Sequence, residues 1–397
     1  MNRLFFYYAA TFFGILSHSM FLYGLIIFAR HLTGKDAGAG TLFFAFSLPI
    51  LLFSMYAGSL ADKVPQKRLL LVAQMASAAM IFLSALSILL GWIDGKGSIW
   101  ILYVCAAFYG LFGAFVMPTR MAIIGNIVDH SKVEQTTIIN NLFVSSSFFL
   151  GPFVAGQFLG FAGWSAIFFG SCLMMILSKV FLFFLPVRWM KPEKSRRRPW
   201  HDLKQGMIFV KNTKLLWQIM ALAFVMFAFF FGPYQVLLPQ FAKGQLFLTE
   251  GSRGLLLSIF GIGSLLANVF VLVLRKFPYR GKLVLATLGI SGILFFITTF
   301  VHSGTIAVLT VGLWGLFFGV GYVLVPALLL ANSHNEMRGR VMGIYIFIWI
   351  GCPALGGMIF SFLSDGIGIV GSLQVAATLA FVLVLFGFYS LKELRRA

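Results

Sequence analysis

Carboxylates are scarce in this 397-residue chain, which holds 11 Asp and Glu against 30 Lys and Arg. Charged residues of all kinds make up only 10% of it, whereas soluble proteins carry about 25%. Hydrophobic residues reach 60%. This composition excludes an ordinary soluble domain and indicates a protein that lies in a membrane.

Cysteine is also rare. Cys105, Cys172 and Cys352 all lie inside apolar runs, with spacings that match neither a metal site nor a disulfide framework. The chain has no Walker motif, catalytic triad, paired carboxylates or metal-ligand cluster. A membrane enzyme that modifies lipids would need acids or histidines converging at one membrane face. We therefore expect no enzyme, no metal and no cofactor.

The net charge of +19 would suit a nucleic-acid partner, but the basic residues lie in short loops between apolar runs. Loop by loop, 23 cations fall on the side of the N-terminus and 5 on the other. Because cationic loops stay in the cytoplasm, both termini should be cytoplasmic. We expect a monomeric, multi-pass protein of a bacterial inner membrane, with no nucleic-acid partner.

Uncharged runs long enough to cross a bilayer, about 20 residues each, follow one another along the chain. Their breaks predict twelve helices, near 5–28, 41–61, 69–90, 99–124, 135–160, 163–187, 215–241, 254–274, 283–301, 305–331, 341–363 and 367–391. The basic segment 188–214 is the long polar linker, so we predict one bundle over 1–187 and another over 215–397. Within the linker, 200–212 is either a surface amphipathic helix or a solvated segment.

An internal repeat indicates that the two halves are related. Tyr109-Gly110-Leu111-Phe112 is echoed by Trp314-Gly315-Leu316-Phe317, and Gly151-Pro152-x-x-x-Gly156 by Cys352-Pro353-x-x-x-Gly357. The echoes fall on helices 4 and 10, then 5 and 11. Duplication of a six-helix unit requires this register.

Gly58-x-Leu60-x-Asp62, followed by Arg68, resembles the loop between helices two and three of the major facilitator superfamily, although Pro65 and Gln66 depart from its usual pattern. The resemblance implies an all-α membrane protein with twelve transmembrane helices in two pseudo-symmetric six-helix bundles. It also implies alternating access around a central cavity. It assigns a conformational latch to Gly58, Asp62 and Arg68.

Three further stretches resemble exporters of that superfamily. Gly151, Pro152 and Gly156 are similar to its helix-5 antiporter motif. Arg338-Gly339-Arg340-Val341-x-Gly343 and Pro353-x-x-Gly356-Gly357 resemble the branch that includes the enterobactin-type siderophore exporters. This resemblance implies export.

The predicted spans contain no mid-membrane carboxylate, but they contain Arg120, His18 and Lys179. A buried charge normally faces a cavity or a partner. Arg120 therefore either binds an anionic part of the substrate or pairs with Asp129 or the loop between helices 4 and 5 near the membrane interface. His18 is either the proton-coupling group or a neutral, hydrogen-bonded histidine. Lys179 more simply extends to the membrane surface.

Other polar side chains on the predicted cavity helices complete a candidate substrate site. Gly232-Pro233 should break helix 7 and free backbone carbonyls toward a cavity. The candidate contacts are Tyr23, Asn140, Asn141, Tyr234, Gln235, Tyr322, Tyr345 and Trp349.

These features predict a secondary transporter for a small organic substrate, with protons as the expected coupling ion and the lipid bilayer as its other partner. Efflux of a siderophore-like, anionic or amphiphilic compound is the first interpretation. Uptake of an amino acid, carboxylate or iron chelate is the second. A receptor that kept the fold but transports nothing is the third.

Overall fold

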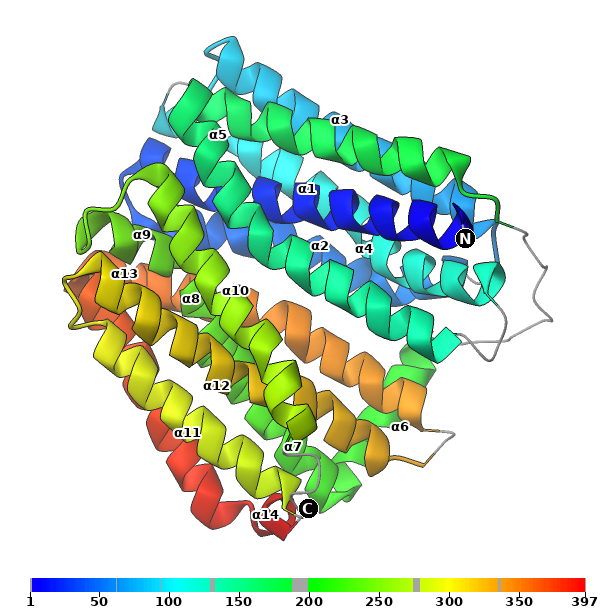
Figure 1. Ribbon diagram of the computed structural model, residues 1–397, viewed down its shortest axis with the longest axis vertical. Coiled ribbons are helices and arrows are strands. Elements are labelled where there is room, and N and C mark those ends of the chain that lie inside the picture. Colours follow the sequence, from blue (N-terminus) through cyan, green and yellow to red (C-terminus); the bar gives the residue numbers. More distant parts are fainter. Residues whose placement is uncertain are drawn as a thin grey trace. The chain divides into compact units, whose positions relative to one another are not determined.

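The computed structural model describes residues 2–61, 63–93, 95–128, 133–187, 199–273, 279–334 and 337–396. Secondary structure in these ranges is helical throughout (Figure 1). The first half contains α1 (Asn2–Thr33), α2 (Asp36–Ala61), α3 (Gln66–Leu89), the short η1 (Lys96–Ser98), α4 (Trp100–Ile127) and α5 (Val133–Phe184). The rest contains α6 (Pro199–Asn212), α7 (Lys214–Val225), the π-helical η3 (Met226–Phe231), α8 (Gly232–Val236), α9 (Leu238–Gly244), α10 (Glu250–Val273), α11 (Arg280–Thr298), α12 (Gly304–Ala331), α13 (Arg338–Ser390) and α14 (Lys392–Arg396).

Two of these helices are too long for one membrane crossing. Helices α5 and α13 have 52 and 53 residues, and at about 1.5 Å per residue each is more than twice as long as a bilayer core is thick. Each is interrupted by a glycine with positive φ, Gly163 at 78° and Gly368 at 80°. Each therefore supplies two crossings. With these two counted twice, the ten apolar helices of the described residues give twelve spans, as predicted.

The chain forms two compact units. Unit 1 comprises Met1–Gly34, Thr41–Pro199 and Glu250–Gly254, and unit 2 comprises Lys35–Gly40, Trp200–Thr249 and Leu255–Ala397. Each unit thus includes the first turn of a helix whose remainder belongs to the other, α2 in one case and α10 in the other. The boundaries predicted at 187 and 215 remain a prediction.

Helix α6 lies on unit 2 and has two different faces. A Cβ built on Gly206 would lie 3.1 Å from the Arg340 Cβ, so this side of the helix packs on the start of α13. On the opposite side Met207 and Ile208 are exposed. The segment 200–212 is thus helical and amphipathic, as one of the two interpretations required.

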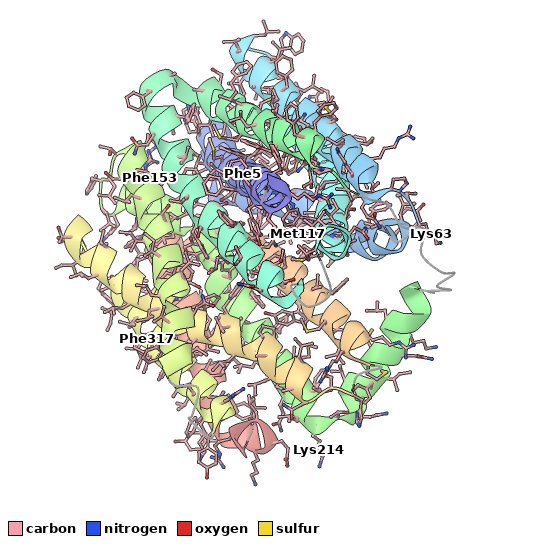
Figure 2. The ribbon with its side chains drawn as sticks, turned by 45° about the vertical axis from the view of Figure 1, so that its right-hand side comes forward. Phe5, Lys63, Met117, Phe153, Lys214 and Phe317 are labelled. Carbon is pink, nitrogen blue, oxygen red and sulfur yellow. The ribbon has the colours of Figure 1, made fainter. Side chains whose placement is uncertain are left out.

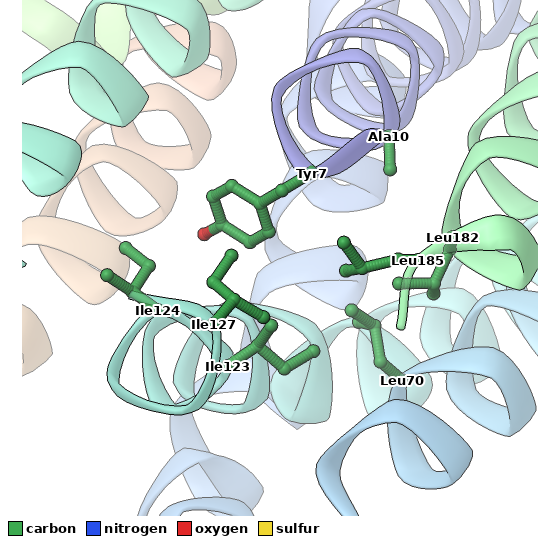
Figure 3. Packing of buried hydrophobic residues seen from close by; sticks show 8 residues of the cluster. All are labelled: Tyr7, Ala10, Leu70, Ile123, Ile124, Ile127, Leu182 and Leu185. Carbon is green, nitrogen blue, oxygen red and sulfur yellow. The ribbon is translucent and has the colours of Figure 1, made fainter. Parts of the chain in front are cut away.

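Apolar side chains form both the interior and the outside of the helices. Inside unit 1, Tyr7 packs with aliphatic residues of α1, α3, α4 and the end of α5 (Figure 3). Outside, Phe5 is 62% exposed, and many other large apolar side chains are exposed with it. Lys63 and Lys214 lie by contrast at helix ends (Figure 2). This distribution suits a protein whose surroundings are lipid along the spans and water at their ends.

The repeated Tyr/Trp-Gly-Leu-Phe motif marks the same contact in each unit. Gly110 of α4 lies against the backbone carbonyl of Phe46 in α2, and Gly315 of α12 lies against that of Phe260 in α10. The preceding ring packs on the same neighbour, Tyr109 at 5.7 Å from Phe46 and Trp314 at 5.0 Å from Phe260. Small residues let membrane helices approach this closely, so the repeat reflects a shared helix contact.

Candidate functional site

Arg120 lies deep inside unit 1, where it is only 2% exposed. Its Nη1 donates a long hydrogen bond, 3.4 Å, to the Thr11 carbonyl of α1, and its own carbonyl accepts one of 3.1 Å from the Tyr7 hydroxyl. Among the described residues, no carboxylate forms an ion pair with this guanidinium. Asp129, the alternative partner suggested by the sequence, lies outside the described residues.

Gly14 of α1 makes room for this charge. A Cβ built there would lie 2.8 Å from the Arg120 Nη2, 2.8 Å from the Ser178 Oγ and 3.2 Å from the Gln74 Nε2. Ser178 accepts a hydrogen bond of 3.3 Å from Gln74 and donates one of 2.6 Å to the Ala10 carbonyl. Four helices therefore contribute to one polar cluster, which we define as Thr11, Gln74, Arg120 and Ser178. Of these four residues, only Arg120 was predicted from the sequence as a site residue.

Several polar atoms in the interior of unit 1 are buried without a hydrogen-bond partner among the described residues. They include the Gln74 Oε1, the Thr11 Oγ1 and both amide atoms of Asn140, which is fully buried in α5. Buried polar atoms normally have partners. The unit 1 interior thus has spare capacity for hydrogen bonding beside a positive charge.

His18 lies close to this region on α1. Its Nδ1 is 3.2 Å from the Tyr109 hydroxyl, and its ring lies 5.5 Å from that of Phe46 and 6.5 Å from that of Phe148. The structure therefore gives His18 the hydrogen bond that its neutral interpretation required. Its role in proton coupling stays a prediction.

The remaining unit 1 candidates do not gather at one place. The Tyr23 hydroxyl is buried and has no partner among the described residues. Asn141 is exposed, although its neighbour Asn140 is buried, because successive residues on a helix point about 100° apart. Lys179 is half-buried, with its Nζ 3.3 Å from the Met75 Sδ.

In unit 2, three candidates do lie together. The Phe227 ring is 6.3 Å from that of Tyr322 and 6.0 Å from that of Tyr345. Trp349 lies within reach of the Tyr322 hydroxyl. This aromatic group, defined as Phe227, Tyr322, Tyr345 and Trp349, joins η3, α12 and α13. Because Phe227 is fully buried and Tyr345 is 7% exposed, an organic molecule reaches these rings only if the surrounding helices move apart.

The predicted break of helix 7 is present, but it packs against another helix. The π-helical turn η3 ends where Gly232 and Pro233 begin α8, and proline has no N–H for the preceding turn. A Cβ on Gly232 would lie 2.7 Å from the Pro353 carbonyl oxygen of α13. Tyr234 is a core residue, and its hydroxyl donates a hydrogen bond of 2.9 Å to the Leu257 carbonyl. The neighbouring Gln235 is also buried, at 8% exposed.

The helix-5 motif provides close helix contacts in two directions. Gly151 lies against Ser19 of α1, and a Cβ on Gly156 would lie 2.6 Å from the Glu250 carbonyl oxygen in the first turn of α10. Gly254, in that same turn, lies against the Pro152 backbone. A Cβ built on Gly254 would lie 2.7 Å from the Pro152 carbonyl carbon. The motif thus lets the first turn of α10 join unit 1.

The latch assigned by resemblance is described only in part. Gly58 is in α2 with no heavy atom within 4 Å of a built Cβ. Arg68 is exposed and lines a surface hollow with Pro65, Leu71 and Val187. Asp62 lies outside the described residues, so the latch stays a prediction.

Comparison with known proteins settles the family. Residues 7–351 match the model of the Major Facilitator Superfamily. The chain belongs to this superfamily. It is therefore a multi-pass membrane transporter of the secondary kind and not an enzyme.

Two similar proteins are named for a substrate or for a resistance phenotype. The chain is 26% identical to multidrug resistance protein 2 of Bacillus subtilis over 343 residues, which covers 83% of this chain and 81% of the relative. It is 23% identical to the staphyloferrin A transporter of Staphylococcus aureus over 329 residues, with the same coverage of each chain. The resemblance to the enterobactin-type branch stays a hypothesis.

Solved structures support the fold alone, because their sequences are distant. The nucleoside transporter NupG superposes with a TM-score of 0.78 at 13% identity over 98% of this chain and 99% of its own. A D-xylose-proton symporter gives 0.75 at 14% identity over 96% of each chain.

Proposed function

We propose that this transporter exports a siderophore-like or otherwise anionic, amphiphilic organic compound across the bacterial inner membrane by alternating access, with both termini in the cytoplasm. Similarity to a staphyloferrin A transporter and to a multidrug resistance protein supports this class of substrate. The helix-5 motif, whose sequence resembles that of exporters and whose glycines make close helix contacts, supports outward transport.

Arg120 is the observation that carries the anionic part of the proposal. A buried charge costs at least about 2.5–3.5 kcal/mol in a membrane, and no carboxylate of the described residues offsets it. Because the guanidinium is 2% exposed, direct contact with a substrate requires the side chain or its helix to move. The charge nevertheless attracts an anion through the low-dielectric interior. Unit 2 separately contains the aromatic group around Phe227, whose rings suit an apolar part of an organic molecule.

Transport by purified protein in liposomes tests the proposal. The substrates are carboxylate siderophores, catecholate siderophores and cationic dyes, offered from either side of the membrane under an imposed pH gradient. We expect saturable movement of an anionic compound from the cytoplasmic side of the protein outward. Movement only in the opposite sense would favour the importer, and transport of cationic dyes alone would refute the anionic substrate.

Variants of Arg120 test whether its charge recognises the anionic substrate. Arg120→Leu should weaken transport of the anion by about tenfold or more, the effect of losing one charge-assisted contact, and Arg120→Lys should restore part of it. Lys179→Met is the matched control, since it removes the cation at the half-buried edge of the same unit. Equal anion affinity in Arg120→Leu and the unchanged protein would exclude Arg120 from recognition.

A further inference from the structure

The start of α2 is capped by a carboxylate from a helix far away in the sequence. The Asp365 Oδ1 of α13 accepts the Asp36 N–H at 2.8 Å, and its Oδ2 accepts the Ala37 N–H at 3.2 Å. The first N–H groups of a helix have no partner within the helix and carry its positive end. An ionised carboxylate is therefore well suited to hold them.

A third hydrogen bond and a close backbone approach strengthen this contact. The Ser364 hydroxyl donates to the Asp36 Oδ2 at 2.5 Å, and both side chains are 4% exposed. One turn further along, a Cβ on Gly40 would lie 2.9 Å from the Met358 Cα. The cap thus combines three directed bonds with a surface that excludes larger side chains.

The position of the cap in the chain suits a role in transport. The capped turn, Lys35–Gly40, belongs to unit 2, whereas α2 from Thr41 onward belongs to unit 1. Any movement of α2 with unit 1 must either break these three bonds or bend the helix after its first turn. With the N-terminus in the cytoplasm, this is the outer end of α2, opposite to the end where resemblance assigns the Asp62 latch.

We propose that Asp365 is a positioning residue of the transport cycle, which holds the outer end of α2 on α13 in one state and releases it in the other. This inference rests on the alternating access of the proposed function. It requires no knowledge of the substrate, because the cap lies within the protein. Ser364 assists by fixing the Asp36 carboxylate.

Hydrogen–deuterium exchange of the full-length protein in lipid nanodiscs tests the proposal without a substrate. Asp365→Asn keeps the size of the side chain and removes its charge, and Asp365→Ala removes the cap. We expect amides of residues 36–40 to exchange about tenfold faster or more. We also expect exchange at the opposite helix ends, near 120–127 and 325–331, to slow as the protein shifts to the outward-open state.

The second readout separates a moving contact from a static cap. Faster exchange confined to residues 36–40 would mean that Asp365 only caps a helix, and unchanged exchange at both ends would overturn the contact itself. Ser364→Ala removes only the hydrogen bond to the Asp36 carboxylate and should change exchange at both helix ends in the same sense, but less. This milder variant keeps the test decisive if Asp365→Ala misfolds. Glu393→Ala, at an exposed acid of α14, is the control. Failure of the proposed function would appear instead as absent transport in the unchanged protein.

Discussion

The glycine contacts that the repeat marks can be tested by adding one methyl group to each. A Cβ on Gly315 would lie 2.8 Å from the Phe260 carbonyl carbon, and a Cβ on Gly110 would lie 3.1 Å from that of Phe46. Carbon atoms pack at about 3.5 Å or more. The carbonyl oxygens of Phe260 and Phe46 lie closer still to the built Cβ atoms, at the same distance in the two units. The helices must therefore separate by more than the carbon–carbon distances require, because backbone atoms cannot rotate away.

Two opposing terms set the size of the effect. Forcing an extra carbon into a packed interior costs about 1–3 kcal/mol, and replacing glycine by alanine within a helix returns up to about 1 kcal/mol. We expect Gly315→Ala and Gly110→Ala each to lower the free energy of unfolding by about 1–2 kcal/mol. For a unit of this size, that lowers the melting temperature by about 2–8 °C.

The assay is thermal unfolding of the purified protein in detergent, followed by tryptophan fluorescence. Gly113→Ala is the matched control, since it lies three residues from Gly110 on the same helix and has no heavy atom within 4 Å of a built Cβ. Gly289→Ala serves the same purpose in unit 2. Melting temperatures equal to those of the controls would refute the idea that the repeated motif exists for close helix approach.

Two other predictions concern the transport cycle. His18→Gln should abolish the response of transport to an imposed pH gradient while the protein stays folded, because imidazole exchanges protons near neutral pH. Tyr109→Phe is the comparison, since it removes only the hydroxyl that contacts His18. An unchanged response in His18→Gln would exclude His18 from proton coupling. Gly254→Ala should obstruct the contact between the first turn of α10 and Pro152, and change the population of the state that contains this contact by about five- to a hundredfold, measured as a slower transport rate. Gly244→Ala is the control and should transport normally, because its built Cβ has open space around it. A normal transport rate for Gly254→Ala would show that the contact has no role.

The number and limits of the membrane spans were predictable because charge interrupts them. The break between helices 5 and 6, expected at 160–163, lies at Ala162 and Gly163. The next such break, after residue 363, lies at Gly368. Glycine at these corners adopts positive φ, which other residues reach only with strain. Composition and glycine position therefore determine this level of the structure.

The neighbours of each side chain could not be predicted in the same way. A membrane helix is apolar toward lipid and toward the protein interior, so periodicity does not indicate which face is buried. Asn140 and Asn141 had equal claims in the sequence, yet one is buried and the other exposed. The placement of Arg120 against Gly14, and of Asp365 against the start of α2, depends on contacts between helices that no local pattern records.

Comparison of the two halves bears on why Arg120 is present. When residues 109–112 of α4 are aligned with 314–317 of α12, Arg120 matches Val325, which is fully buried. One fold therefore accommodates an aliphatic side chain at this place in unit 2 and a charged one in unit 1. Replacing a buried charge by an apolar residue of similar volume is often neutral or stabilising. Arg120→Leu should accordingly melt no lower than the unchanged protein while it loses the anionic substrate. A variant that fails to fold would show instead that the guanidinium cross-links the helices of unit 1.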